Sequence, residues 1–411
     1  MKNAVNLLVS VIFFASLILF ADNHLNSAMA GTKKPKVIRI AMIEDLSGPY
    51  APVLTGVHSA IMDACEYVNK ELGGIEGVHV EPVIRDFGGK VDVAISAYME
   101  LIEMRPRPLT LGMLHSSTAE ALKVRFAEDK IPSIVGTSTS SIYPVGYTFG
   151  RYPLYADMFG AFIDWMVENW DREKMGRGPR LAFLTWDTAY GRSVLIEECF
   201  AYARKKGVSI VGKELFGVRD MDVTTQLVRI RQKKPDWIYT NITSVGPAVI
   251  AKSAHSMGYN IKLANGLGND WSAIKIAPKA MEGAINVMSF DSWDDHNSKG
   301  IKAVNRYFVD KKRKSSEKAA GYLLTWTYVL TAAEAIDRAV KEEGWKGLNG
   351  AAVRTQLEKM KDFSPLGLGY FTYTPKKHAP SRVYISQIKG GKIIPITGWR
   401  DCPDLRPDKF K

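Results

Sequence analysis

The chain has 411 residues and a formal net charge of +12, with 46% hydrophobic and 24% charged residues. This balance is typical of globular proteins with large apolar cores, and it excludes disordered, collagen-like and disulfide-scaffold classes. At roughly 100 to 200 residues per domain, the length predicts two to three domains. The basic residues are spread along the whole chain without a nucleic-acid recognition motif, so we expect no nucleic-acid partner and interpret the charge as a solubility property that mildly favours anionic solutes.

Residues 1–30 are predicted to form a signal peptide. Lys2 supplies the positive start, Leu7 to Ala21 is an apolar run, and Ala28-Met29-Ala30 has the small-x-small pattern of a cleavage site. The apolar run is short of the roughly 20 residues that span a bilayer. We therefore expect a soluble mature protein, exported to the periplasm and beginning near Gly31.

From Val37 to Val135, predicted strands and helices alternate, which is the pattern of a parallel α/β sheet. β-branched runs predict the strands, and apolar residues three and four apart predict the helices. The expected strands are Val37–Ile43, Val78–Ile84, Leu109–Leu114 and Pro132–Val135, and the helices between them start at Val57, Val91 and Ala119.

A second α/β series follows Tyr152-Pro153. Its expected strands are Arg180–Thr185, Ser209–Leu215, Trp237–Thr240, Ile261–Ala264 and Ile285–Phe290, each preceded or followed by a helical pattern. Three later helical patterns, around 302–309, 321–340 and 351–360, have no strands between them. Such helices must pack on a sheet that already exists, so the chain is expected to cross back between lobes. Strands at Gly369–Thr374 and Arg382–Lys389 are expected to form a terminal hairpin.

Motifs of cofactor-binding and catalytic proteins are absent from the sequence. It contains no P-loop, HExxH, GxSxG or zinc pattern, and Gly266-Leu267-Gly268 lacks the third glycine of a dinucleotide fingerprint, so it is interpreted as a turn. Cys65, Cys199 and Cys402 have no metal-ligand spacing, and their odd number allows at most one internal disulfide. We expect no cofactor, no metal site and no enzymatic activity.

Polar residues follow several predicted strands, where open α/β sheets bind ligands. Ser116 and Ser117 open a helix after the third strand, and Ser117 with Glu120 has capping-box spacing. The free amides of a helix start attract a carboxylate, although a helix cap alone would also explain these residues. A second hydroxyl cluster, Thr137 to Ser141, follows the fourth strand and could equally be a plain polar loop.

In the second series, the run from Thr185 to Gly191 (TWDTAYG) follows a strand and opens a helix, which places an aromatic ring with a polar tip at the sheet edge. Thr240-Asn241 and the run from Asn269 to Trp271 follow later strands. Each of these alone is also compatible with a structural turn.

The segments IRIAMIEDLSGPYA, NKELGGIEG, GMLHSSTAEA, WDTAYG and MEGAINV, in this order, resemble the periplasmic solute-binding proteins of the branched-chain amino-acid-binding (leucine-binding) type, which serve ABC importers. The resemblance covers residues 36–400. It implies a type I periplasmic binding protein fold, α/β, with two Rossmann-like lobes joined by a three-crossover hinge. On this resemblance the N-terminal lobe comprises 31–150 and 288–365, and the C-terminal lobe 151–287 and 366–411.

The resemblance also implies a ligand site between the lobes. Ser116 and Ser117 match the segment that receives a ligand carboxylate, Ser138 and Thr139 match the next polar loop, and Tyr190 matches the aromatic residue that closes over the ligand. Thr240 or Asn241 matches a further contact. The family's acidic partner for an α-ammonium group falls where this chain has no carboxylate, around 266–269, and Asp270 or Asp187 could substitute.

The leading hypothesis is a binding protein that captures a small solute and delivers it to a membrane permease of an ABC importer. An amino acid is the first expectation for the solute. An aromatic or other organic acid is the second, because Tyr50, Trp186, Tyr190 and Trp271 could supply aromatic walls. An exported ligand sensor with the same fold is the alternative from another class, and an exported α/β hydrolase would need a nucleophile motif that the sequence lacks.

Overall fold

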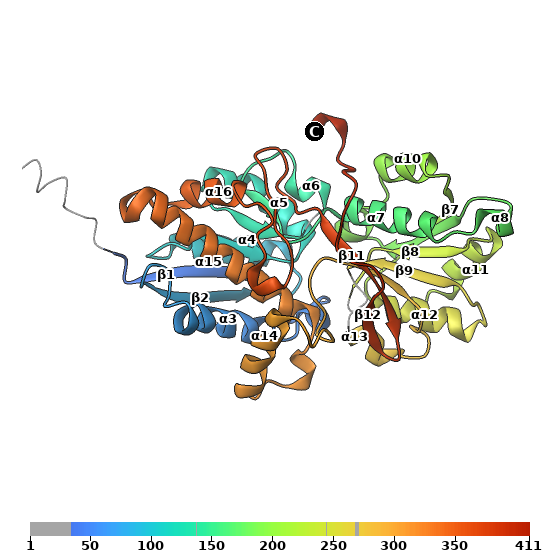
Figure 1. Ribbon diagram of the computed structural model, residues 1–411, viewed down its shortest axis with the longest axis horizontal. Coiled ribbons are helices and arrows are strands. Elements are labelled where there is room, and N and C mark those ends of the chain that lie inside the picture. The colour runs from blue at the N-terminus through green and yellow to red at the C-terminus, as the bar shows by residue number, and fades with distance from the viewer. Residues whose placement is uncertain (1–33, 137, 244, 268–270) are drawn as a thin grey trace, which may run out of the picture.

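The computed structural model describes residues 34–136, 138–243, 245–267 and 271–411, which form two lobes lying side by side, each built on one sheet (Figure 1). The first sheet is parallel throughout, with strand order β2-β1-β3-β4-β5. Its strands are β1 (Val37–Glu44), β2 (His79–Asp86), β3 (Thr110–Met113), β4 (Ser133–Val135) and β5 (Thr148–Gly150).

The second sheet has the order β12-β11-β10-β9-β8-β6-β7, with β13 paired to β11. The strands from β6 to β10 are parallel, whereas β11 and β12 are added in antiparallel register. Its strands are β6 (Arg180–Trp186), β7 (Ser209–Phe216), β8 (Trp237–Thr240), β9 (Lys262–Gly266), β10 (Ile285–Met288), β11 (Arg382–Lys389), β12 (Lys392–Pro395) and β13 (Arg400–Asp401).

Helices cover both faces of each sheet (Figure 1). Those with early sequence numbers are α2 (Ala51–Leu54), α3 (Val57–Glu71), α4 (Val91–Glu103), α5 (Ser116–Glu128) and α6 (Thr139–Ile142). The middle of the chain forms α7 (Tyr155–Glu168), α8 (Arg172–Met175), α9 (Ala189–Arg192), α10 (Glu197–Lys205), α11 (Thr224–Gln232), α12 (Gly246–Ser256) and α13 (Trp271–Ile276). The late helices are α14 (Lys299–Asp310), α15 (Ala320–Gly347) and α16 (Gly350–Glu358).

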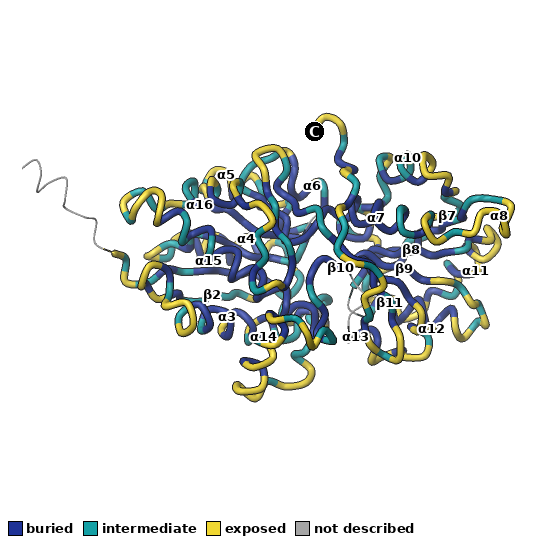
Figure 2. The backbone as a smooth tube through the Cα atoms, in the orientation of Figure 1, coloured by how far each residue is buried: buried dark blue, intermediate teal, exposed yellow. Residues whose placement is uncertain are grey.

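The buried strands form the core of both lobes, and exposed residues concentrate on the outer helices (Figure 2). Along β1, alternate side chains point to opposite faces of the sheet. Ile40 and Met42 pack in the cluster that contains residues of α3 and α15, whereas Ala41 and Ile43 pack with residues of α4 and α5. A strand buried on both faces is apolar at nearly every position, which explains the continuous apolar run that identified β1 in the sequence.

The late helices return to the first lobe, as the sequence predicted for helices without strands of their own. α15 packs against α3 and β1, and α16 packs against α15. Three connections therefore pass between the lobes: from β5 to α7, from β10 to α14, and from α16 to β11.

The expected hairpin of 369–374 with Arg382–Lys389 is wrong. The segment 369–374 makes only isolated bridges, such as Phe363 with Phe371, and β11 instead forms a hairpin with β12. The physical reason is that 369–374 lies in a connection between lobes, where Tyr373 donates a hydrogen bond to the carbonyl oxygen of Gly150, 2.7 Å away. Its alternating pattern reflects burial at this junction, since Phe371 and Tyr373 are both buried.

Both sheets have their second strand at the edge and their first strand beside it, so the direction of strand addition reverses between β1 and β3 and again between β6 and β8. Ligands of open α/β sheets bind beyond the carboxyl ends of strands at such a reversal. The fold therefore brings the loops after β1, β3, β6 and β8 to the site.

Three further findings concern the chain as a whole. The expected signal peptide, residues 1–30, lies outside the described residues. None of the described helices combines the length and apolar character needed to cross a membrane. Cys65, Cys199 and Cys402 are buried free thiols.

Candidate functional site

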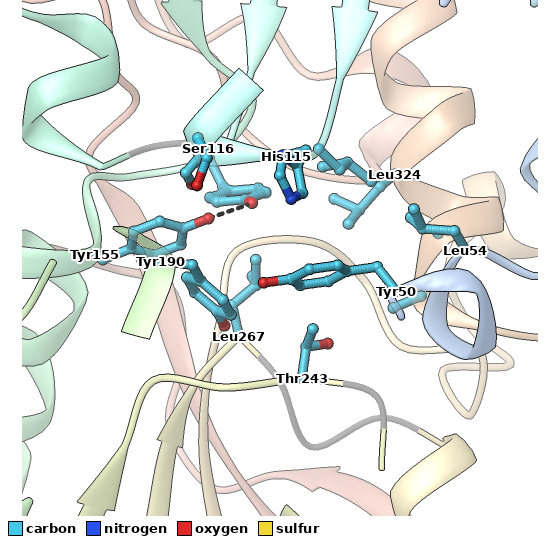
Figure 3. A pocket seen from close by; sticks show the side chains of 14 residues that line it. Tyr50, Leu54, His115, Ser116, Tyr155, Tyr190, Thr243, Leu267 and Leu324 are labelled. Atoms are coloured by element: carbon cyan, nitrogen blue, oxygen red, sulfur yellow. Dashed lines mark hydrogen bonds between the residues drawn. The ribbon is translucent and has the colours of Figure 1, made fainter. Parts of the chain in front are cut away.

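A cavity of about 50 Å³ lies where the loops of both sheets meet (Figure 3). The first sheet contributes residues after β1 and β3, and the second contributes residues after β6, β8 and β9. The crossover after β5 and the start of α15 complete the wall. The lining residues are Tyr50, Leu54, Leu114, His115, Ser116, Ser117, Tyr152, Tyr155, Tyr190, Thr243, Leu267, Ala320, Gly321 and Leu324.

The start of α5 forms one wall of the cavity. His115 is the N-cap residue, and its Nδ1 atom accepts a hydrogen bond from the backbone N–H of Thr118 at 3.3 Å. Because Nδ1 accepts there, the neutral imidazole carries its proton on Nε2, which is a donor. Burial lowers the pKa of His115, so this neutral form is favoured near pH 7.

Ser116 is a buried residue of this wall with a hydroxyl group that is free among the described residues. It is 4% exposed, and its Oγ atom has no hydrogen-bond partner within the described chain. A buried hydroxyl without a partner is costly, because it has lost its water without replacement. The helix start therefore offers a ready donor beside the positive end of the α5 dipole.

The expected capping box of Ser117 with Glu120 is wrong. His115 caps the helix instead, and the carboxylate of Glu120 accepts hydrogen bonds from the hydroxyls of Ser138 and Ser140. The sequence pattern assigned Glu120 to the cap of α5, but its carboxylate is engaged by the two hydroxyls of the loop after β4. Ser117 is thereby left as a half-buried residue of the cavity wall.

Three tyrosines form a second part of the wall. The hydroxyl groups of Tyr152 and Tyr155 are hydrogen-bonded at 2.8 Å, and the Tyr155 ring lies 4.7 Å from that of Tyr190. The Tyr190 hydroxyl donates to the carbonyl oxygens of Ile242 and Gly266 at 3.2 and 3.4 Å. Tyr190 is therefore held against the second sheet.

The turn that carries Tyr190 depends on a glycine. A Cβ atom at Gly191 would lie 2.1 Å from the carbonyl oxygen of Trp186, so no other residue fits without moving the backbone. Thr188 caps the short helix α9 by accepting from the N–H of Gly191 at 3.1 Å. The TWDTAYG run thus forms the strand end, cap and helix start that the sequence predicted.

Tyr50 connects the two lobes across the cavity. Its ring meets that of His115 edge-on at 5.2 Å and that of Trp186 at 5.7 Å, and its hydroxyl is hydrogen-bonded to the side chain of Thr188. Burial raises the pKa of Tyr50 to about 12, so the phenol stays protonated. Since His115 belongs to the first lobe and Trp186 and Thr188 to the second, this contact exists only while the lobes are close together.

The structure places four other predicted residues outside the cavity wall. Ser138 caps α6, and the Oγ1 atom of Thr139 is buried without a partner but does not line the cavity. Asn241 donates to the carbonyl oxygen of Tyr190 at 2.7 Å and so supports the wall from behind. Asp187 is exposed and paired with Arg192 at 2.5 Å, which lowers the pKa of its carboxyl group.

Three candidates remain predictions. Asp270 lies outside the described residues, and so does the side chain of Trp271. Thr240 is buried at the end of β8, with no hydrogen-bond partner for its Oγ1 within the described chain.

Sequence reasoning missed part of the wall. His115 stands inside a segment that was singled out, but its side chain was not recognised as the cap. Tyr155 and Leu324 carry no local motif, and only the crossovers bring them to the cavity. Thr243 lies in the loop after β8 and also carries no motif. The one available signal for Tyr155 was its position two residues after Pro153, where the chain crosses between the lobes.

Among the described residues of the cavity wall, none is an aspartate, glutamate, lysine or arginine. The polar groups are hydroxyls, one imidazole and the amides of the α5 start, and the remainder is aliphatic. Such a wall can hold a carboxylate by hydrogen bonds and enclose an apolar body.

A periplasmic binding protein family model matches residues 37–392, and the chain belongs to this family. Its members are substrate-binding proteins that bind small molecules and work with the permeases of ABC transporters. No curated protein matches the sequence significantly.

Solved structures of similar fold cover nearly the whole chain. A branched chain amino acid ABC transporter protein from Thermus thermophilus with bound valine has a TM-score of 0.80 at 20% identity, covering 91% of this chain and 98% of its own. A fatty acid ABC transporter substrate-binding protein from Thermomonospora curvata gives 0.77 at 21%, covering 92% and 95%. A leucine binding protein from Thermotoga maritima gives 0.70 at 18%, covering 89% and 99%. These similarities establish the type I periplasmic binding protein fold.

Proposed function

We propose that the protein captures a small organic acid between its lobes in the periplasm and delivers it to the permease of an ABC importer. The observation that carries this proposal is the buried, unpartnered Ser116 hydroxyl at the start of α5, in a wall whose described residues carry no charged side chain. A carboxylate would receive the free hydroxyl, the helix-start amides and the Nε2 proton of His115. Hydrogen bonds to a charged group are the strong ones.

The size and character of the wall restrict the rest of the solute. Leu54, Leu114, Leu267 and Leu324 present aliphatic surface, and the tyrosines present ring faces. At about 50 Å³ the cavity has room for about one or two water molecules, so a branched short chain or a single ring requires the lobes to move slightly apart. A long-chain fatty acid would require them to open much further.

An amino acid is the second candidate, because one structure of the same fold contains valine. An ammonium group taken out of water needs an opposing charge or several acceptors. Asp187 is exposed and already paired, so Asp270 would have to approach the nitrogen. The two candidates therefore differ in their dependence on Asp270.

A thermal-shift and calorimetry screen tests the proposal. The compounds are isovalerate and benzoate, their uncharged matches isovaleramide and benzamide, and the amino acids valine and leucine. We expect an acid to stabilise the protein more than its amide, and Asp270→Asn to leave that binding unchanged. Binding of valine or leucine that Asp270→Asn abolishes would establish the amino-acid alternative instead.

A further inference from the structure

A buried ion pair lies behind the first lobe's share of the cavity wall. Glu44 ends β1 and Arg151 begins the crossover after β5, and both side chains are 0% exposed. Their nearest charged atoms are 3.8 Å apart, which is beyond hydrogen-bond distance. They attract each other as charges without forming the bidentate contact usual for arginine and a carboxylate.

The hydrogen bonds of this pair are incomplete. The Oε2 atom of Glu44 accepts from the backbone N–H of Leu114 at 3.0 Å, whereas Oε1 has no partner. All three nitrogens of the Arg151 guanidinium also lack an acceptor within the described chain, and the group lies over the ring of Tyr328 at 5.1 Å. An arginine cannot lose its proton, so a buried positive charge remains that Glu44 opposes only in part.

Both partners are joined directly to the cavity wall. Leu114, which donates to Glu44, lines the cavity, and so does Tyr152, which follows Arg151 in the chain. Burial raises the pKa of Tyr152, and the charge of Arg151 opposes that rise. The positive field of Arg151 therefore reaches the cavity wall. Gly112 keeps this space open, because a Cβ atom there would lie 2.8 Å from a guanidinium nitrogen.

We propose that Arg151 is the residue that makes this site select an anion, and that Glu44 takes up a proton from the solvent when a carboxylate binds. The inference rests on the proposed function and deepens it. An anion in the cavity adds a second negative charge near Glu44, and like charges at close range favour protonation of one of them. Protonated Glu44 leaves the whole Arg151 charge to face the anion.

The electrostatic surroundings of Glu44 agree with this geometry. Burial raises the pKa of Glu44 to about 7, opposed by Arg151 and by the Leu114 amide, while neighbouring Asp45 raises it further. The other titratable groups around the pair are the phenols of Tyr152, Tyr328 and Tyr373, which stay neutral near pH 7. On the cavity side the titratable groups are His115 and the phenols of Tyr50, Tyr155 and Tyr190.

The sign of the pH dependence follows. If carboxylate binding raises the pKa of Glu44, the affinity for the acid rises as the pH falls from 8 through 7. The affinity stops changing with pH once Glu44 is protonated in the free protein as well. A neutral amide should show no such dependence.

Calorimetry of isovalerate and benzoate at pH 7, in phosphate and in Tris, measures the proton directly, because the two buffers differ in ionisation enthalpy. We expect uptake of about half a proton by the wild-type protein. Glu44→Gln keeps the acceptor for the Leu114 amide. We expect it to abolish the uptake, and to bind the acid about twofold more tightly than the wild-type protein at pH 7 and about tenfold more tightly at pH 8. A merely structural role for Glu44 would give weaker binding.

Arg151→Met should weaken acid binding at least about tenfold and leave the binding of isovaleramide or benzamide nearly unchanged, while Arg151→Lys restores preference for the acid. Heats that are independent of the buffer, or uptake that persists in Glu44→Gln and so belongs to His115, would overturn this inference while an acid still binds. Failure of both acids to bind the wild-type protein would overturn the proposed function and this inference with it.

Discussion

Replacing Ser116 by alanine tests the wall of the cavity without disturbing the fold. Ser116 is the first residue of α5, and the cap is supplied by His115 instead. Since the Ser116 Oγ atom has no hydrogen-bond partner in the described chain, its removal breaks no bond of the free protein. We expect the free energy of unfolding to change by less than about 0.5 kcal/mol.

Ligand binding should respond far more strongly. In the proposed complex the hydroxyl donates to a carboxylate, and a hydrogen bond to a charged group contributes roughly 1.5 to 3 kcal/mol. Its loss corresponds to about a 10- to 150-fold increase in Kd. Calorimetry with isovalerate or benzoate on wild-type protein and Ser116→Ala measures this difference.

Thr139→Ala is the matched control. Its hydroxyl oxygen is also buried without a partner, but Thr139 does not line the cavity. Equal affinity of Ser116→Ala and wild-type protein, with normal unfolding of both, would refute the reasoning. Weaker binding by Thr139→Ala would show that the loop after β4 contributes to the site, as the sequence had suggested.

Three further changes have defined outcomes. Asp187→Asn should leave acid binding unchanged in calorimetry, because Asp187 is exposed and its partner is Arg192. Tyr190→Phe should lower the free energy of unfolding by about 1 kcal/mol in a denaturant titration, because the phenol no longer donates to the carbonyl oxygens of Ile242 and Gly266. Burial opposes ionisation of Asp404, but Arg406 and Lys377 outweigh it and hold its pKa at about 2. The stabilisation from this depressed pKa is present above about pH 4 and is lost as the pH falls towards 2, so Arg406→Ala should bring acid unfolding to a higher pH; an unchanged acid transition would contradict this.

The sequence was sufficient for the regular elements because their signals are local. β1 was found from its β-branched run, and α3 from apolar residues recurring every three to four positions. The segment 369–374 was wrongly predicted to be a strand, because burial that alternates along a connection between the lobes produces the same sequence pattern as a strand. β5 went unrecognised, since only Phe149 of its three residues is a large apolar residue.

The candidate site was predictable where a residue follows directly from a strand end. Ser116, Ser117 and Tyr190 meet that condition, and all three line the cavity. Ser138 and Asn241 meet it as well, yet they hydrogen-bond to Glu120 and to the backbone of Tyr190. Whether a polar side chain faces a ligand or supports a neighbour depends on partners far away in the chain, which no local pattern records. The Glu44–Arg151 pair was not predicted for the same reason, because it joins a residue of β1 to a residue of the first crossover.

A crystal structure of the protein with the acid that stabilises it most tests the central claim most directly. The account predicts one molecule between the lobes, with a carboxylate oxygen about 3 Å from the Ser116 Oγ atom and its apolar body against Leu54 and Leu324. A carboxylate directed away from the start of α5, or an acid bound elsewhere with the cavity between the lobes unfilled, would contradict it.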